Sequence, residues 1–209
     1  MKKIDRSKLT DDFIAKLINT KPDIEEGKKM IFDAVKQIIP AYNIASLKGL
    51  DFDRTLIEFE NWLVQTITTD PIPISVKSLW FGLADTTNKE DAATGVGGEI
   101  QMTIKGTKYL PQTRPKDWFK KDLWDASSKT SEIKAYKTIS NSLKNYADDA
   151  QDIQSLVLVS LTVLLIINGF DIIKHEFLIY QNSLVIGCGY ETGNQYIVGK
   201  LVEDGMVNC

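Results

Sequence analysis

Residues 71–83, PIPISVKSLWFGL, decide the fold, because a helical pattern gives way here to a strand pattern. Two prolines open the stretch, and proline disrupts a helix interior since it lacks a backbone N–H. From Ile74 onward apolar and polar residues alternate, and the run then becomes continuously apolar up to Leu83. Such a run is typical of a strand that enters the core of a sheet. We therefore expect helices before this stretch and a sheet after it.

The residues before this stretch predict three helices with short links. Ser7 or Thr10 is expected to cap the first helix, and Pro40 ends the second. Apolar residues at helical spacing over 56–67 mark the third. This pattern indicates a helical N-terminal subdomain over residues 1–70.

The residues after the stretch predict a sheet-containing subdomain over residues 71–209. Residues 84–98 are polar and glycine-rich and are expected to form a loop, whereas residues 99–104 alternate with the period of a strand. Gly106 is expected to bulge or end that strand. An amphipathic helix is predicted over 131–147.

Two later segments complete the predicted architecture. Residues 153–170 carry no charge, and we interpret them as a helix buried on all sides or a helix that hands over to a strand. Their apolar heart is shorter than the roughly 20 residues that a bilayer requires, so membrane insertion is the weaker interpretation. Residues 184–190 and 195–201 indicate a β-hairpin, and Gly187 and Gly189 are expected to permit close packing of a helix.

Strands and helices are grouped along the chain rather than alternating, which favours an α+β fold over a doubly wound sheet. We expect an N-terminal helical segment followed by a mainly antiparallel β-sheet packed with helices. The two subdomains, 1–70 and 71–209, are expected to form one continuous globular unit, because 209 residues are too few for two ordinary cores.

The composition excludes several classes of protein. The chain is 43% hydrophobic and 25% charged, unlike a disordered chain, and its two cysteines do not make a disulfide-dense scaffold. A net charge of −3 disfavours a nucleic-acid binder that works by phosphate neutralisation. One histidine, His175, and two cysteines leave too few nitrogen and sulfur ligands for a zinc site. We expect no catalytic residue, no metal and no cofactor.

The chain is expected to be cytoplasmic. Its first residues, MKKIDRSKLTDDF, hold no apolar stretch of the ~7–15 residues that a secretory signal needs. Cys188 lies in an apolar segment and Cys209 is the last residue. A bridge between the two is one alternative, and a buried reduced Cys188 with an unpaired Cys209 is the favoured one.

Charge is distributed in blocks along the chain. Residues 51–100 hold 3 basic and 9 acidic residues, a net charge of −6, whereas residues 101–150 hold 10 basic and 6 acidic residues, a net charge of +4. Most such blocks are solvated faces, and complementary fields also steer partners. The candidate partner-binding residues of the acidic block are Asp85, Glu90, Asp91 and Glu99.

Residues 109–124 place aromatic side chains among basic ones, with Trp118 and Trp124 as the largest. Packing of both tryptophans at the edge of the core is the first interpretation, and a protein interface is the second. Stacking on single-stranded nucleic acid is the third. Trp118 and Trp124 therefore form the second set of candidate contact residues.

One short motif points to catalysis. Residues 50–56, LDFDRTL, resemble the first motif of haloacid-dehalogenase-type phosphatases, in which one aspartate attacks phosphorus and holds magnesium and a second handles a proton. The resemblance assigns these roles to Asp51 and Asp53. The motif should follow a buried parallel strand, and residues 42–49 contain no run of apolar strand residues. The other interpretation is that Asp51 caps the third helix and Asp53 lies in its first turn.

A set of short motifs occurs in an order that resembles immunity proteins of bacterial toxin systems. The motifs are Asn61-Trp62-Leu63, Pro71-Ile72-Pro73, Val76–Leu83, Ile104–Tyr109, Asp117-Trp118 and Val185–Gly193. In that family a strand ends in Phe-Gly-Leu, a Gly-Ser/Thr-x-Tyr motif precedes Asp-Trp, and a Gly-Phe-Asp-x-Gly hairpin closes the domain. The chain departs from the last motif, where it reads CGYETG, and the resemblance covers residues 60–200.

The resemblance implies binding rather than catalysis. A folded immunity protein occludes the active site of its toxin or holds the toxin inactive, so no active site is carried over. We expect a non-enzymatic protein that neutralises a cognate bacterial toxin, such as a basic nuclease domain, by direct contact, with neither nucleic acid nor membrane as a partner. The alternatives are a magnesium-dependent phosphatase that uses Asp51 and Asp53, and a housekeeping scaffold that associates with several host proteins.

Overall fold

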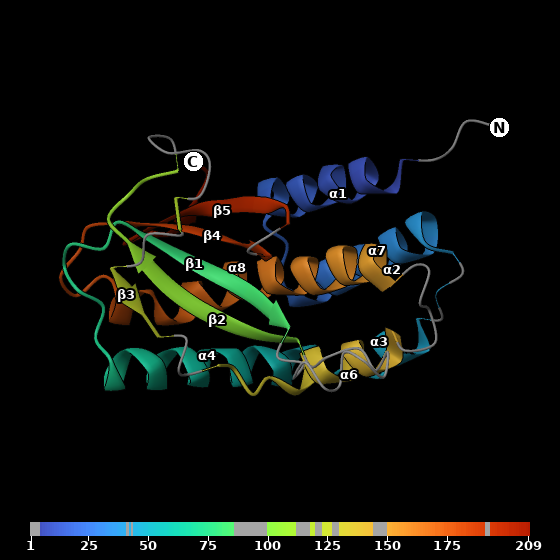
Figure 1. The fold of residues 1–209 in the computed structure, drawn as a ribbon, viewed down its shortest axis with the longest axis horizontal. Helices are drawn as coiled ribbons and strands as arrows, with labels where there is room; N and C mark the ends of the chain where they lie inside the picture. The colour runs from blue at the N-terminus through green and yellow to red at the C-terminus, as the bar shows by residue number, and fades with distance from the viewer. Residues whose placement is uncertain are drawn as a thin grey trace.

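A computed structural model gives the arrangement of the chain (Figure 1). It describes residues 5–40, 42, 44–85, 100–111, 118–119, 123–126, 130–143, 150–190 and 193–209. These residues form a six-stranded sheet with helices packed against it, and the expected α+β class is confirmed.

The sheet has the strand order β3-β2-β1-β4-β5-β6. Its strands are β1 (Ser78–Asp85), β2 (Ile100–Thr107), β3 (Trp124–Asp125), β4 (Leu184–Tyr190), β5 (Gln195–Val202) and β6 (Gly205–Val207). Every junction is antiparallel except β1–β4, because the helices between β3 and β4 carry the chain back before it rejoins the sheet. The expected antiparallel hairpin is confirmed as β4 and β5.

In the described part of the chain, four helices precede the sheet. They are α1 (Arg6–Thr20), α2 (Ile24–Ile38), α3 (Ala45–Lys48) and α4 (Phe52–Thr69). The three long ones confirm the three predicted helices, and each begins at an aspartate, Asp5, Asp23 or Asp51, whose side chain accepts a hydrogen bond from a backbone N–H of the first turn. The prediction that Ser7 or Thr10 caps α1 is wrong, because both residues lie inside the helix that Asp5 caps.

The other helices of the described residues lie between β3 and β4. They are α6 (Lys134–Leu143), α7 (Ala150–Ile153), the π-helix η1 (Gln154–Leu158) and α8 (Val159–Phe177). The residues that flank η1 keep helical backbone angles, so α7, η1 and α8 continue one another. Most of α8 is buried, which confirms the prediction of a buried helix and excludes the alternative of a handover to a strand within it.

Within the described ranges one helix, Gln154–Phe177, is long and apolar enough to cross a membrane, with a mean hydropathy of 2.4. Of its most apolar window, 83% is buried inside the fold. A buried apolar helix of this kind is also what the core of a soluble protein contains, so the length and composition of the helix are weak support for a membrane span.

The core joins the N-terminal helices to one face of the sheet. Phe59 of α4 lies 5.9 Å from Phe81 of β1, and Phe81 lies 5.8 Å from Phe170 of α8, as measured between ring centroids. Gly169 lets α4 and α8 approach closely, because a methyl group there would lie 2.8 Å from the ring of Phe59. Ile14 of α1 belongs to the same buried cluster, so helices and sheet share one core.

A smaller aromatic cluster covers the opposite face of the sheet. Trp80 follows the alternation of β1 away from Phe81, and the ring of Phe119 stacks on it at 4.3 Å. Trp118 meets Trp80 edge-on at 5.7 Å, and Ile197 of β5 packs beside the three. All three rings are at most 2% exposed, so this face of β1 is closed.

Strand glycines make room for these indoles. A methyl group on Gly187 would lie 2.8 Å from Trp118, and one on Gly106 would lie 3.2 Å from Trp124. The expectation that Gly187 lets a helix pack closely is therefore corrected, since the group packed against it is an indole. The expectation that Gly106 bulges or ends its strand is wrong, because Gly106 is paired on both sides within β2, with Leu79 and Trp124.

Candidate functional site

The acidic candidate contacts fall at the end of β1 and beyond it. Asp85 is the last residue of β1. Glu90, Asp91 and Glu99 lie outside the described residues, as does nearly all of the loop predicted for residues 84–98. This set of contacts therefore stays a prediction.

The two aromatic candidates are buried. Trp118 is 1% exposed within the cluster around Trp80, and Trp124 is 5% exposed within the main core. The first interpretation of these side chains, packing in the core, is confirmed. Their selection as contact residues is corrected, since a side chain that the fold has enclosed offers a partner no surface.

Asp51 is a helix cap. Its Oδ1 accepts a hydrogen bond of 3.0 Å from the backbone N–H of Arg54, and Asp53 lies in the first turn of α4. The residues before Asp51 form α3 rather than a strand, so the motif lacks the context that a phosphatase nucleophile requires. The capping interpretation is confirmed.

The two cysteines and the histidine lie in different environments. Cys188 is fully buried and Cys209 is exposed, both as free thiols, which confirms the favoured alternative for the cysteines. Burial raises the pKa of the Cys188 thiol, so it stays protonated, whereas His175 lies at the surface. In the described parts of the chain, no three His, Cys, Asp or Glu side chains lie close enough together to hold a metal ion.

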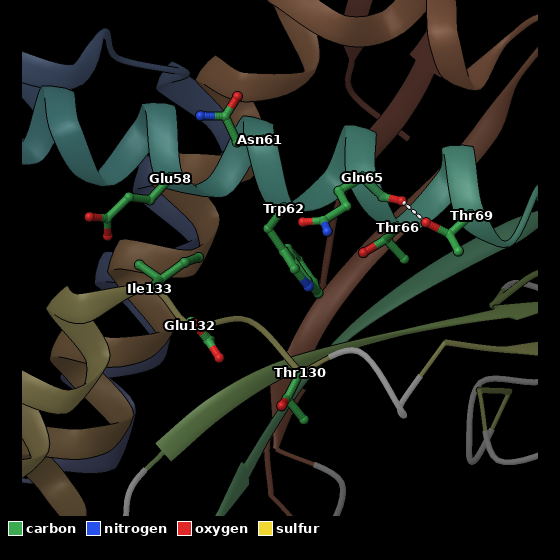
Figure 2. Close-up of a pocket in the computed structure, with 9 residues that line it drawn as sticks. All are labelled: Glu58, Asn61, Trp62, Gln65, Thr66, Thr69, Thr130, Glu132 and Ile133. Atoms are coloured by element: carbon green, nitrogen blue, oxygen red, sulfur yellow. Dashed lines mark hydrogen bonds between the residues drawn. The ribbon is translucent and has the colours of Figure 1, made fainter.

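A polar groove of about 610 Å³ lies between α4 and the segment that leads into α6 (Figure 2). Its lining combines two carboxylates, two amides, three hydroxyls, one indole and one aliphatic side chain. The lining residues are Glu58, Asn61, Trp62, Gln65, Thr66, Thr69, Thr130, Glu132 and Ile133. We refer to this feature as the α4 groove.

One stripe of α4 supplies the upper wall of the α4 groove. Glu58, Trp62, Gln65 and Thr69 follow one another at intervals of three or four residues, which places them on one side of a helix. The helix is anchored by its opposite side, where Phe59 and Leu63 are fully buried. The polar stripe is thereby held toward solvent.

Backbone hydrogen bonds hold the lower wall in place. The N–H of Ser131 donates to the carbonyl of Met102 at 2.9 Å, and the N–H of Met102 donates to Ser131 Oγ at 3.1 Å. These two bonds fasten Ser131 to the edge of β2. The N–H of Lys134 then donates to Glu58 Oε2 at 3.1 Å, so the start of α6 is tied directly to α4.

Trp62 is the aromatic wall of the α4 groove. Its ring centroid lies 6.1 Å from that of Phe59 and 6.4 Å from that of Phe81, and these contacts with the core set its orientation. Figure 2 shows the indole reaching from α4 toward Thr130, with Glu58 and Glu132 on the same side of the ring. Trp62 is half-buried, whereas the other three tryptophans of the chain are at most 5% exposed.

The lining of the α4 groove carries negative charge alone. Glu58 is partly compensated, because Arg54 donates from Nε to its Oε1 at 3.3 Å. Glu132 is exposed and forms no hydrogen bond or ion pair with another described residue. No lysine or arginine lines the groove in the described structure. The arrangement is suited to a cationic ligand.

A second hollow, of about 290 Å³, lies between the C-terminal ends of α4 and α8 and is more apolar. It is lined by residues that include Ile67, Ile72 and Phe177, with Ile179 and Tyr180 more than 60% exposed at its rim. Its lining includes one charged side chain, Glu176, whereas the lining of the α4 groove includes two. The α4 groove is therefore the better candidate for recognition by charge.

Comparisons with known proteins add no family to this geometry. No family model matches the chain, and neither a curated protein nor a solved structure is significantly similar to it.

The sequence analysis missed the carboxylates of this groove. Glu58 lies in the acidic block of residues 51–100 but was not among the candidate contacts. The sequence signal that points to it is its helical spacing with Trp62 and Gln65. Glu132 carries no comparable signal, because its place opposite Trp62 depends on the pairing of Ser131 with β2.

Proposed function

We propose that the chain is a non-enzymatic, cytoplasmic protein that binds and neutralises a cognate bacterial toxin by direct contact. The resemblance of residues 60–200 to immunity proteins suggests this class of function. A toxin domain with a basic surface, such as a nuclease, is the partner that the charge of this chain would attract.

The observation that carries the proposal is the α4 groove. Its lining is negative, and Glu132 forms no ion pair with another described residue. Its two walls are held by the core and by β2, so little conformational entropy is lost when a partner docks. A preformed concave site with an aromatic wall and charges at its rim is typical of a protein-recognition surface.

The proposal is tested by capture and protection in the source organism. The full chain, tagged at one end, is used to isolate partners from lysate, and the partner is then expressed with and without this chain. We expect one dominant partner that carries a toxin-like domain and inhibits growth unless this chain is present. Several host proteins in comparable amounts, or a partner whose toxicity is unchanged, would contradict the proposal.

No observation favours the phosphatase alternative. The side chain of Asp51 is engaged by the backbone of α4, and the sheet presents no strand that ends at this residue. A magnesium-dependent hydrolysis of phosphate esters that is lost in Asp51→Asn would reinstate it.

A further inference from the structure

We infer that the α4 groove binds an arginine side chain presented by the protein partner, with the guanidinium against Trp62 and directed toward Glu132 and Gln65. The inference rests on the proposed function in that it names the contact through which a toxin would be held. It concerns a site that the fold itself provides, and its test needs no toxin.

The lining chemistry selects arginine among cationic groups. A guanidinium is planar, so it stacks on an indole while it donates hydrogen bonds in its own plane to carboxylates and amides. The α4 groove offers this combination, with the amide of Gln65 beside the ring of Trp62 and the carboxylate of Glu132 facing the same hollow (Figure 2). A lysine ammonium would meet the charge but not the planar geometry.

The groove already holds one guanidinium contact. Arg54 donates from Nε to Glu58 Oε1 at 3.3 Å, while its own side chain is 65% exposed. Glu58 is therefore placed so that a guanidinium N–H reaches it from solvent. Glu132, by contrast, forms no ion pair with another described residue and is open to an incoming guanidinium.

The size of the site fits a segment of a protein rather than a free ion. A hollow of about 610 Å³ falls within the ~300–1,000 Å³ range of ligand sites and exceeds the volume of one side chain. The hydroxyls of Thr69 and Thr130 line the same hollow as Trp62 and extend it along α4. They give the backbone that flanks an inserted arginine further groups with which to hydrogen-bond.

The probes are the peptide acetyl-Gly-Arg-Gly-amide and its counterpart with citrulline, which is neutral and nearly isosteric with arginine. Binding is followed by the indole N–H signals of the full chain in ¹H–¹⁵N NMR spectra. The chain has 4 tryptophans, and the signal of Trp62 is assigned by its loss in Trp62→Phe. We expect the arginine peptide to shift the Trp62 signal and the citrulline peptide to leave it in place.

Two variants with opposite expected effects keep the test independent of folding. Glu132→Gln should weaken the arginine peptide by about two- to fivefold, since one exposed ion pair is lost. Arg54→Gln should tighten binding by a similar factor, since a positive charge beside the groove is removed. Glu203→Gln changes an exposed carboxylate at the opposite edge of the sheet and should have no effect.

Three results would overturn the inference. They are an equal response to the citrulline peptide, movement of the buried indoles without Trp62, or a Trp62 shift produced by a neutral oligosaccharide but not by arginine. If the arginine peptide does not bind but a toxin is captured from lysate, the proposed function is retained, and the toxin contacts a surface other than the α4 groove. Arginine binding without any captured toxin would support the groove and contradict the toxin partner.

Discussion

The acidic side chains of α4 show how one chemical group serves different ends according to its surroundings. Asp51 satisfies a backbone N–H at the start of the helix. Glu58 accepts from the first N–H of α6 and from Arg54. Glu60, two residues later, has an Oε1 that is shielded from water and has no hydrogen-bond partner among the described residues. The first two accept hydrogen bonds that the fold provides, whereas the third is shielded from water without such a partner.

The loss of stability on replacing Asp51 should depend on whether the new side chain can accept the capping hydrogen bond. Asp51→Ala should lower the free energy of unfolding by about 1 kcal/mol, because an N–H of α4 loses its partner. Asp51→Asn should lower it far less, since asparagine caps almost as well. Urea denaturation of the two variants measures the difference. Equal losses in both would mean that the carboxylate does more than cap.

Glu60 should make the unfolding free energy depend on pH. Desolvation raises the pKa of Glu60 above its ordinary value of 4.5, so the folded state favours the protonated acid. The stabilising contribution is therefore complete below pH 4.5 and is lost as the pH rises through the folded-state pKa. Glu60→Gln should raise stability at pH 7 and have less effect at pH 4.

The comparison for Glu60 is Glu132→Gln, measured by urea denaturation at the same two pH values. Glu132 is exposed and is not shielded from water, so its replacement should leave the unfolding free energy nearly unchanged at both. A Glu60→Gln variant that is less stable at pH 7 would show that the ionised carboxylate is favoured in the folded protein.

At the scale of elements, the hairpin of β4 and β5 depends on one backbone conformation. Gly189 has a φ of 143°, which side-chain-bearing residues rarely adopt, and a methyl group there would lie 2.2 Å from the carbonyl oxygen of Asn194. Asn194 and Tyr196, at the start of β5, donate to Asp11 of α1 at 2.8 Å and 2.6 Å. A distortion of the hairpin is therefore transmitted to the N-terminal helix.

Gly189→Ala should destabilise the protein by more than about 2 kcal/mol, because backbone strain and a steric clash with a main-chain atom act together. Gly193→Ala is the matched control in the same hairpin, where the nearest atom to the added methyl group is a Tyr190 side-chain carbon at 3.1 Å. Thermal unfolding of both variants gives the comparison. The two glycines should differ clearly, and equal effects would contradict the strain at Gly189.

For the whole molecule, the shared core predicts a single cooperative unfolding transition. The buried cluster includes Ile14 and Phe59 from the N-terminal helices together with Phe81 and Leu184 from the sheet. Helical ellipticity reports on all helices, whereas three of the four tryptophans, Trp80, Trp118 and Trp124, lie in the sheet or pack against it. Helical ellipticity and tryptophan fluorescence should give coincident denaturation curves. Separate midpoints would mean that residues 1–70 and 71–209 unfold as independent units.

Helices and strands were predictable where short-range interactions set them. The aspartates before α2 and α4, the prolines that follow the helices, and the apolar spacing of the long helices act within a few residues of chain. The buried helix α8 and the β4–β5 hairpin were likewise readable from local hydrophobic patterns. The first cap was missed because Asp5, Ser7 and Thr10 are all competent caps and lie close together.

The sequence by itself therefore determined the α+β class, the three long N-terminal helices and the buried helix of this protein, since each depends on periodicity and capping along the chain. The tertiary structure alone decided which surface is available. It enclosed Trp118 and Trp124 against glycines of distant strands, and it brought Glu132 opposite Trp62. Those contacts join residues far apart in sequence, and their geometry follows from strand pairing and packing that no local pattern encodes.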